Sequence, residues 1–574
     1  MTRSTASTRD VLLPWLMGTV AIAMAYATVI FLTGGFTLQI AGLRVRSHSW
    51  ERPVVVAVAA AAIAMLMARS RVAAAWAHAA CAIASQRFAT GLALVAAGWA
   101  LTAGIVFGTF AVGGADSSGY AAQARLFAQG RLTDRIPADP TFDWPDAAAT
   151  LTPLGFTVGT TAGVIAPLYP PGLPLLLSPL VTFGAAMFLV VPFFGALLVW
   201  CTYRLGTSIA DPHTGAAAAA LIAASPTFLY QVVQPLSDVP AAACWLAALL
   251  AALHATAAGA AAAGAICSLA ILIRPNLAPL AALVAIATIV SAPTGRTRRA
   301  LSFAALVLPG LLVLGWIQEA RYGSPFASGY GPLSEAFSID NVLPNLSRYP
   351  RWLTDTHTPL IWLTVASPVW IVRRARHRSV AWLVLALAAA TWLAYLPYAY
   401  FHPDEWHYTR FLLLAIAIML IFASAIAASA LRLAPQSWRI AAAVALVAGL
   451  VVGLLHAAAS HGAFTIRDLE QRYPRAGAFV RDRLPPSAFV FAAQHSGSIR
   501  YYAGRPIVRW DVLAPDRLDN VVATLRARGY EPYLVADSEE VVLFRNRFMA
   551  AHQQSAAGLT PLAILGDVQV LGFR

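Results

Sequence analysis

The chain has 574 residues, of which 59% are hydrophobic and only 11% are charged. A soluble globular protein carries about 25% charged residues, so this composition excludes an ordinary soluble domain. The formal net charge is +14. The arginines gather in short clusters between apolar runs, however, and this pattern indicates membrane orientation rather than nucleic-acid binding. We therefore predict a polytopic helical membrane protein with no nucleic-acid partner.

Several apolar runs reach the roughly 17–25 residues that a helix needs to cross a bilayer. Together with shorter runs between arginine-rich loops, they predict an all-α polytopic bundle of about thirteen transmembrane helices. These helices are expected near residues 11–33, 53–68, 89–112, 185–205, 214–230, 239–257, 258–273, 278–292, 300–318, 359–373, 380–400, 410–428 and 439–456.

The arginine clusters fix the predicted orientation of this bundle. Those at 296–299 and 373–378 fall on the same side as the N-terminus, which the positive-inside rule places in the cytoplasm. The two long loops, 113–184 and 319–358, then lie outside, with juxtamembrane helices, and so does the C-terminal segment. A bacterial cytoplasmic membrane is the predicted location.

The first outer loop begins with "GGADSSGYAAQARLFAQGRL", residues 113–132. We expect a helix over 117–129 that lies flat on the outer surface, with Gly130 ending it. Asp116 stands at the start of this helix. One interpretation is an N-terminal cap, since Asp suits the positive end of a helix dipole. The other is a functional carboxylate facing the lipid headgroups. The later "PLYPPGLPLLLSPL" is short and broken by proline, so it is expected in the interface rather than across the membrane.

From about residue 460 the composition changes. Segments that alternate between helical and strand patterns follow one another: "RDLEQRYPRAGAFVRDRL", "AFVFAA", "SGSIRYYAG", "PIVRW", "DRLDNVVATLRARGY" and "PYLVAD". Such alternation predicts a small α/β domain of about a hundred residues. The predicted division is thus a transmembrane domain, 1–459, and an extracytoplasmic α/β domain, 460–574.

A third outer loop, "YFHPDEWHYTRFLLLA" at 400–415, packs His402, Asp404, Glu405, His407 and Arg410 between two spans. Ionisable residues at span ends indicate function. Arg410 opens the next helix, where its guanidinium fork could hold a phosphate; the alternative is an interfacial anchor. A metal site is a further alternative, with His402, Glu405 and His407 as ligands. A divalent cation is thus the one cofactor left open.

The order of these motifs resembles a known family. An apolar helix is followed by "D…GY…A…F..G.L", then "YPPGLPLLLSPL", then "SP…SDVPAA", over roughly residues 89–275, and "EWHYTRFLLLA" continues the likeness. This order is similar to that of the integral-membrane glycosyltransferases of the C superfamily, which include protein O-mannosyltransferases and the lipid A aminoarabinose transferase. In that family an Asp of the first outer loop acts at the catalytic centre, and Asp116 occupies the matching place. Many members have an Asp-Glu pair, whereas Asp116 is followed here by Ser117.

The resemblance implies transfer of a sugar from a polyprenyl-phosphate donor to an acceptor hydroxyl on a glycan, lipid or protein. Such a transfer needs a base for the acceptor proton and stabilisation of the departing phosphate. We predict Asp116 as the catalytic base of an inverting reaction. The residues expected to bind the donor are Asp238, Arg274, His402, Glu405, His407 and Arg410.

Two of these donor-binding predictions have equal structural alternatives. Asp238 in "QPLSDVPAA" also has the position of a helix cap, with Pro240 following. Arg274 in "LIRPN" also reads as the end of a short helix. For the whole chain, two other functions stay open: a ligase or polymerase of lipid-linked glycans, and a transporter or flippase of lipid-linked sugars. Transporters tend to carry polar residues at the bilayer midplane, whereas the ionisable residues here lie at span ends.

Overall fold

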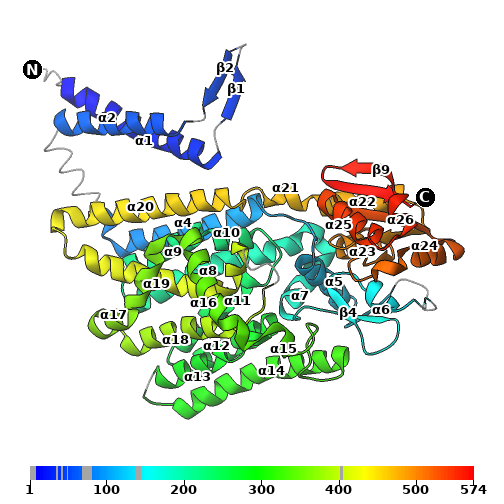
Figure 1. Ribbon diagram of the computed structural model, residues 1–574. Helices are drawn as coiled ribbons and strands as arrows, with labels where there is room; N and C mark the ends of the chain where they lie inside the picture. The colour runs from blue at the N-terminus through cyan, green and yellow to red at the C-terminus, as the bar shows by residue number, and fades with distance from the viewer. Residues whose placement is uncertain are drawn as a thin grey trace, which may run out of the picture.

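The computed structural model describes a largely helical chain over residues 8–33, 36–40, 43–47, 49–67, 81–136, 142, 144–291, 293–400 and 405–573. Figure 1 shows a body of helices, with the C-terminal segment at one end of it beside α5 and β4. The N-terminal pair, α1 (Thr8–Thr33) and α2 (Glu51–Met67), lies next to this body and is joined by the hairpin of β1 (Phe36–Ile40) and β2 (Leu43–Ser47). Arg3, at the N-terminus predicted to be cytoplasmic, lies outside the described residues, as do Arg69 and Arg71.

Six helices among the described residues are long and apolar enough to cross a bilayer, and a bent pair makes a seventh candidate. The six are α4 (Gln86–Val106), the run from α7 (Gly172–Leu177) through η1 (Ser178–Leu189) to α8 (Val190–Ile209), α14 (Arg296–Tyr322), α18 (Arg378–Tyr395), η5 (Trp406–Leu412) with α19 (Leu413–Leu431), and α20 (Gln436–Ser460). The bent pair is α9 (Pro212–Ala224) and α10 (Pro226–Val232), at 61°. The chain is therefore a multi-pass helical membrane protein.

Shorter apolar helices complete the bundle. They are α11 (Asp238–Ala252), α12 (Ala257–Ile273) and α13 (Leu280–Val290), with η2 (Pro275–Leu277) between the last two, and η4 (Pro359–Ala366) with α17 (Ser367–Arg374). Most of these helices coincide with the predicted spans. The Pro-rich segment expected in the interface forms α7 and part of η1, and η1 bends at Gly184, where φ is +59°. The count of about thirteen spans stays a prediction.

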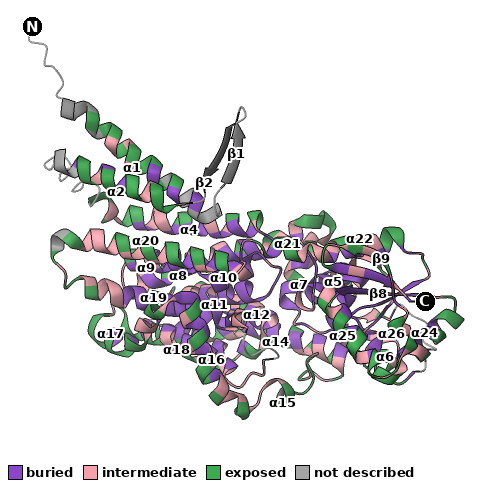
Figure 2. Cartoon of the chain, turned by 45° about the horizontal axis from the view of Figure 1, so that its top comes forward, coloured by how far each residue is buried: buried purple, intermediate pink, exposed green. Residues whose placement is uncertain are grey.

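The core of the bundle is α19, where every residue from Leu413 to Ala425 is buried. Small residues let its neighbours approach closely, as is common in membrane bundles. At the contact of α8 with α9, a Cβ on Gly206 would lie 2.7 Å from the Cα of Gly215. Figure 2 shows the opposite arrangement along α20, whose described residues are exposed or intermediate except for Leu454 and Ala458. Its exposed side chains include Val444 and Val452, as expected of a face that meets lipid.

The two long loops also contain regular structure. The first holds α5 (Asp116–Ala128), α6 (Ala147–Thr150) and a three-stranded antiparallel sheet in the order β3 (Asp134–Arg135), β5 (Val164–Pro167), β4 (Phe156–Val158). The second holds α15 (Leu333–Ala336), η3 (Ile339–Asn341) and α16 (Val342–His357). The predicted helix of the first loop is confirmed as α5, and Gly130 follows it with φ of +68°. The small sheet was not predicted.

The C-terminal segment folds around a five-stranded mixed sheet in the order β7 (Ile507–Val508), β6 (Ala488–Phe491), β8 (Glu531–Asp537), β10 (Val568–Gly572), β9 (Thr560–Leu565). β6 is parallel to β7 and β8, whereas β10 is antiparallel to β8 and β9. Its helices are α21 (Ile466–Glu470), α22 (Arg472–Arg483), α23 (Ser496–Ala503), η6 (Pro515–Arg517), α24 (Leu518–Ala527), α25 (Ser538–Met549) and α26 (Gln554–Ala557). Each predicted helix and strand is present; α25, α26 and the β9–β10 hairpin were not predicted.

The C-terminal segment contacts residues 109–113, which lead from α4 into the first long loop. Gln471 Nε2 donates to the carbonyl of Thr109 at 2.8 Å, and the amide of Val112 donates to the Tyr502 hydroxyl at 2.8 Å. Tyr473 packs against Gly113, where a Cβ would lie 1.9 Å from its ring. The backbone that leads from α4 to Asp116 is therefore held by residues that lie far along the chain.

Candidate functional site

Asp116 is the first residue of α5 and its carboxylate points away from the helix backbone toward two other elements. Oδ1 accepts a hydrogen bond from the Tyr169 hydroxyl at 2.7 Å, and Oδ2 lies 2.8 Å from Nη1 of Arg410. The N-cap residue is Ala115 rather than Asp116. Ser117 instead binds the backbone of Gly113, through both its amide and its carbonyl. The Asp116 carboxylate therefore binds the side chains of Tyr169 and Arg410 and does not cap its own helix.

The surroundings of Asp116 act on its pKa in opposite directions. Burial alone would raise the pKa, because it disfavours the charged form. The Arg410 guanidinium, the Tyr169 hydroxyl and the more distant Arg274 outweigh burial and hold the pKa of Asp116 below its usual value. The carboxylate is thus charged at neutral pH, although only 29% of its side chain is exposed.

A second ion pair lies beside the first. Asp238, the first residue of α11, places Oδ1 2.5 Å from Nη2 of Arg274, which follows the last residue of α12. Arg274 also donates from Nη1 to the Tyr395 hydroxyl at 2.8 Å. The N-cap of α11 is Ser237 rather than Asp238. Only 2% of the Asp238 side chain is exposed, so this pair is enclosed.

Phe411 joins the two ion pairs. The guanidinium carbons of Arg274 and Arg410 each lie 4.9 Å from the centroid of its ring, within the range of a cation–π contact. The Nε atoms of both arginines are buried, and neither has a hydrogen-bond partner in the described part of the chain. Two guanidinium groups therefore lie beside the same aromatic ring, and each has an N–H donor without a partner in the described residues.

Further aromatic residues complete the wall next to Asp116. The rings of Tyr120 and Tyr169 lie 4.9 Å apart, and the Tyr120 hydroxyl donates to Ser237 Oγ at 2.8 Å. Tyr330, from the loop 319–358, meets the edge of Tyr169 at 5.9 Å. The two long loops, 113–184 and 319–358, and the α10–α11 junction thus contribute to the same site.

Two of the remaining predicted site residues, Glu405 and His407, lie next to or on η5. Oε2 of Glu405 is 2.9 Å from Nε2 of His407, and this pair is more exposed than the other two. Tyr230 packs against both His407 and Trp406. His402 and Asp404 lie outside the described residues. Within the described ranges, the structure has no cluster of three or more His, Cys, Asp or Glu side chains suited to a metal ion.

The structure thus brings together four of the predicted residues, Asp116, Asp238, Arg274 and Arg410. The sequence analysis missed Tyr169, Tyr395 and Phe411, which bind or flank Asp116, Arg274 and Arg410. Tyr169 lies within "PLYPPGLP" and Phe411 directly follows Arg410. For Tyr169 and Phe411, a position inside a recognised motif was the signal that could have found them.

Solved structures of membrane glycosyltransferases are similar to this chain. ArnT from Cupriavidus metallidurans bound to undecaprenyl phosphate is 16% identical, with a TM-score of 0.49 over 84% of this chain and 98% of that chain. The Archaeoglobus fulgidus oligosaccharyltransferase is 14% identical, with a TM-score of 0.47 over 79% of this chain and 69% of that chain. Arabinofuranosyltransferase AftD from mycobacteria is 15% identical, with a TM-score of 0.49 over 85% of this chain and 40% of that chain.

Comparisons with protein-family models and with curated proteins gave no match.

Proposed function

We propose that the protein is a membrane glycosyltransferase that moves a sugar from a polyprenyl-phosphate donor to an acceptor hydroxyl at the outer face of a bacterial cytoplasmic membrane. The observation that carries the proposal is the pairing of Asp116 with Arg410 beside a second ion pair, Asp238 with Arg274. A carboxylate and two guanidinium groups at one place meet both needs of the reaction, a base for a hydroxyl and cations for a phosphate.

In this proposal Arg410 and Arg274 hold the donor phosphate, with Phe411 fixing the planes of both guanidinium groups. The Nε donors of both arginines are buried and have no partner in the described part of the chain, so phosphate oxygens would reach them only once the side chains move on donor binding. When a phosphate oxygen takes Arg410, Asp116 loses its ion-pair partner. The main influence that lowers its pKa is then neutralised, while burial and the Tyr169 hydrogen bond remain. Donor binding therefore converts a weak base into a stronger one.

Asp116 then accepts the proton of the acceptor hydroxyl. The acceptor oxygen forms a bond to the anomeric carbon as the bond between that carbon and the phosphate oxygen breaks. The electron pair of the broken bond leaves with the polyprenyl phosphate, where the two arginines stabilise the charge. Attack on the face opposite the leaving group inverts the anomeric configuration. The acceptor is a glycan, lipid or protein hydroxyl.

The predicted topology is also part of the proposal. About thirteen spans, with the arginine clusters in the cytoplasm, place the ends of four spans outside, at residues 116, 238, 274 and 410. The contacts among these four residues support that arrangement. The division into a transmembrane domain, 1–459, and an extracytoplasmic domain, 460–574, follows from it. A C-terminal reporter that is active only outside the cytoplasm should be active; activity of a cytoplasmic reporter would overturn the topology.

Transfer itself is tested with membranes that contain the protein and labelled polyprenyl-phosphate sugars. The expected result is label on an acceptor, lost in the Arg410→Gln variant. Movement of intact labelled donor across the membrane, without transfer, would favour a flippase instead. Adding a chelator tests the divalent cation: unchanged transfer would exclude a readily removed metal ion.

A further inference from the structure

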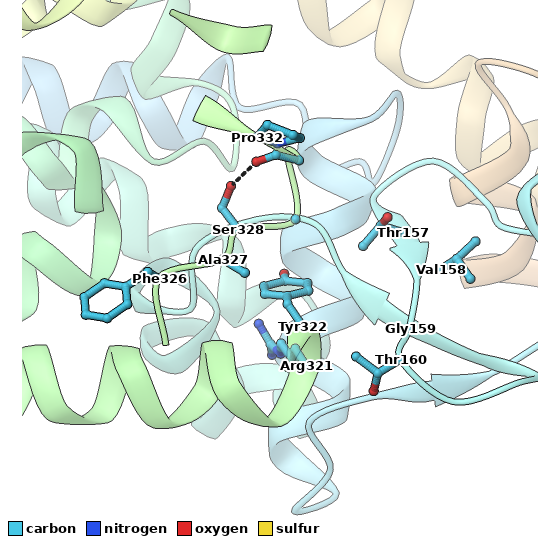
Figure 3. Close-up of a pocket in the computed structure, with 12 residues that line it drawn as sticks. Thr157, Val158, Gly159, Thr160, Arg321, Tyr322, Phe326, Ala327, Ser328 and Pro332 are labelled. Atoms are coloured by element: carbon cyan, nitrogen blue, oxygen red, sulfur yellow. Dashed lines mark hydrogen bonds between the residues drawn. The ribbon is translucent and has the colours of Figure 1, made fainter. Parts of the chain in front are cut away.

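A cavity of about 610 Å³ with a mixed polar and apolar lining lies next to the site just described. Figure 3 shows its walls: the turn between β4 and β5 on one side and the loop 326–332 on the other, with Arg321 and Tyr322 between them. These two residues end α14. Hydroxyl groups of Thr157, Thr160 and Ser328 are part of the lining.

Arg321 is a buried cation whose contacts are with neutral groups. It is only 2% exposed. Nε donates to the carbonyl of Leu132 at 3.1 Å. Both terminal nitrogens donate to the side-chain oxygen of Gln123, at 2.8 and 2.9 Å, in the amide orientation that also lets Gln123 donate to the carbonyl of Tyr169. No carboxylate pairs with Arg321 within the described part of the chain.

An unpaired buried charge is strongly unfavourable, so buried cations are normally matched by an anion. Arginine presents a planar fork of donors that suits phosphate and carboxylate groups. A cation that lines a cavity, without a carboxylate partner from the described protein, is the arrangement expected where the ligand supplies the negative charge.

The same two elements, loop 326–332 and helix α5, contact both the cavity and the proposed catalytic site. Loop 326–332 lines the cavity, and its Tyr330 packs on Tyr169, which binds Asp116. Gln123 binds Arg321 and belongs to the same helix as Asp116. Seven residues of α-helix span roughly 10 Å. An anion held at Arg321 would therefore lie within reach of a hydroxyl that belongs to the same molecule and approaches Asp116.

We propose that this cavity binds an anionic group of the acceptor, a phosphate or a carboxylate, and that Arg321 is the cation that holds it. That the anion belongs to the acceptor rests on the proposed transferase function. That an anion binds at Arg321 is independent of that function.

The test is titration of inorganic phosphate into the full-length protein in neutral detergent, followed by calorimetry. Two phosphate sites are expected, since Arg410 forms the other. Arg321→Gln should remove one of them and Arg410→Gln the other. A separate titration with acetate reports whether the cavity also accepts a carboxylate.

Thr160 offers a variant that leaves Arg321 in place. It lines the cavity and is exposed, so substitution there should not disturb folding. Thr160→Glu should weaken phosphate binding at the Arg321 site by about tenfold or more, because a nearby carboxylate repels the bound anion. Thr160→Gln, matched in size, should bind phosphate as the wild type does. Equal binding by the two variants, or a single phosphate site that disappears with Arg410→Gln alone, would overturn the proposal.

A comparison of nanodiscs distinguishes two sources of the anion. If a lipid headgroup is the ligand, phosphatidylglycerol should compete with phosphate at the Arg321 site and phosphatidylcholine should not. If the anion belongs to a soluble molecule, both nanodiscs should leave phosphate binding unchanged. Phosphate binding that depends on Arg321, in a protein without transferase activity, would refute the proposed function while leaving the anion site intact.

Discussion

The two ion pairs of the site differ in their access to solvent. Asp238 and Arg274 are enclosed, with 2% and 13% of their side chains exposed, and Tyr395 occupies a further donor of the arginine. For Asp116 and Arg410, the exposed fractions of the side chains are 29% and 17%. A buried pair is difficult to open, because either charge left alone is strongly unfavourable. The more open pair is the one that a ligand can enter. We therefore expect Asp116–Arg410 to open during the proposed reaction, and Asp238 to keep Arg274 in place as the second cation for the phosphate.

The largest expected effect is on turnover. Asp116→Asn keeps the size of the side chain but removes the base, so turnover should fall by roughly two to four orders of magnitude, the usual contribution of general base catalysis. Single-turnover transfer in detergent measures this. The melting temperature should fall less than in Asp238→Asn. An Asn variant with near-normal turnover would remove Asp116 from the chemistry.

Asp238→Asn should act on stability first. It leaves the Arg274 charge enclosed without a partner, which typically destabilises by about 3–5 kcal/mol. Thermal unfolding of the detergent-solubilised protein measures the loss. The matched control is Arg432→Gln, which breaks an exposed pair with Asp211 and should change stability by about 0–1 kcal/mol. Similar effects of the two substitutions would contradict the contrast between enclosed and open pairs.

Arg410→Ala should raise the concentration of donor needed for half-maximal rate by roughly 10- to 100-fold, the value of a hydrogen bond to a charged group. The requirement for acceptor should change much less. Arg410→Lys should recover part of the loss, because a point charge replaces a fork. Kinetics with each substrate varied in turn separate the two requirements. If both requirements rise equally, Arg410 is an anchor rather than a phosphate ligand.

The smallest effect concerns pH. The pKa of Asp116 lies below its usual value, so its carboxylate should stay charged at pH values where an ordinary Asp side chain becomes protonated. In Arg410→Gln the principal opposing charge is gone, burial dominates, and the acid limb of the residual kcat/KM should move to higher pH. Burial raises the pKa of Glu470 to about 7, so Glu470→Gln is the control for a limb near neutrality. An unmoved acid limb in Arg410→Gln would show that Asp116 does not set it.

Much of the fold was predictable because long apolar runs and arginine-rich loops are strong signals in a sequence. The same signals led to the prediction that Asp116, Asp238, Arg274 and Arg410 lie at span ends. The cap interpretation remained an alternative for Asp116 and had equal support for Asp238, since a first-turn carboxylate looks alike whether it binds its own helix or a distant arginine. Only the tertiary contacts with Arg410 and Arg274 separate these cases.

Other features had little sequence signal. Strands β3, β4 and β5 have two to four residues each, too few to display alternation. The attachment of the C-terminal segment uses backbone atoms of Thr109 and Val112, which every residue type possesses. Arg321 was invisible as a candidate because its significance depends on the absence of a carboxylate partner in the described structure.

The most direct test of the central claim is to measure donor binding and turnover together in Asp116→Asn. If the donor phosphate displaces the Asp116 carboxylate from Arg410, removing that carboxylate leaves the arginine open to the donor. We predict that the Kd for polyprenyl phosphate is unchanged or lower in the variant, while single-turnover transfer falls by roughly two to four orders of magnitude. Donor binding that weakens in proportion to turnover would contradict the account, since it would make Asp116 a support for Arg410 rather than the base.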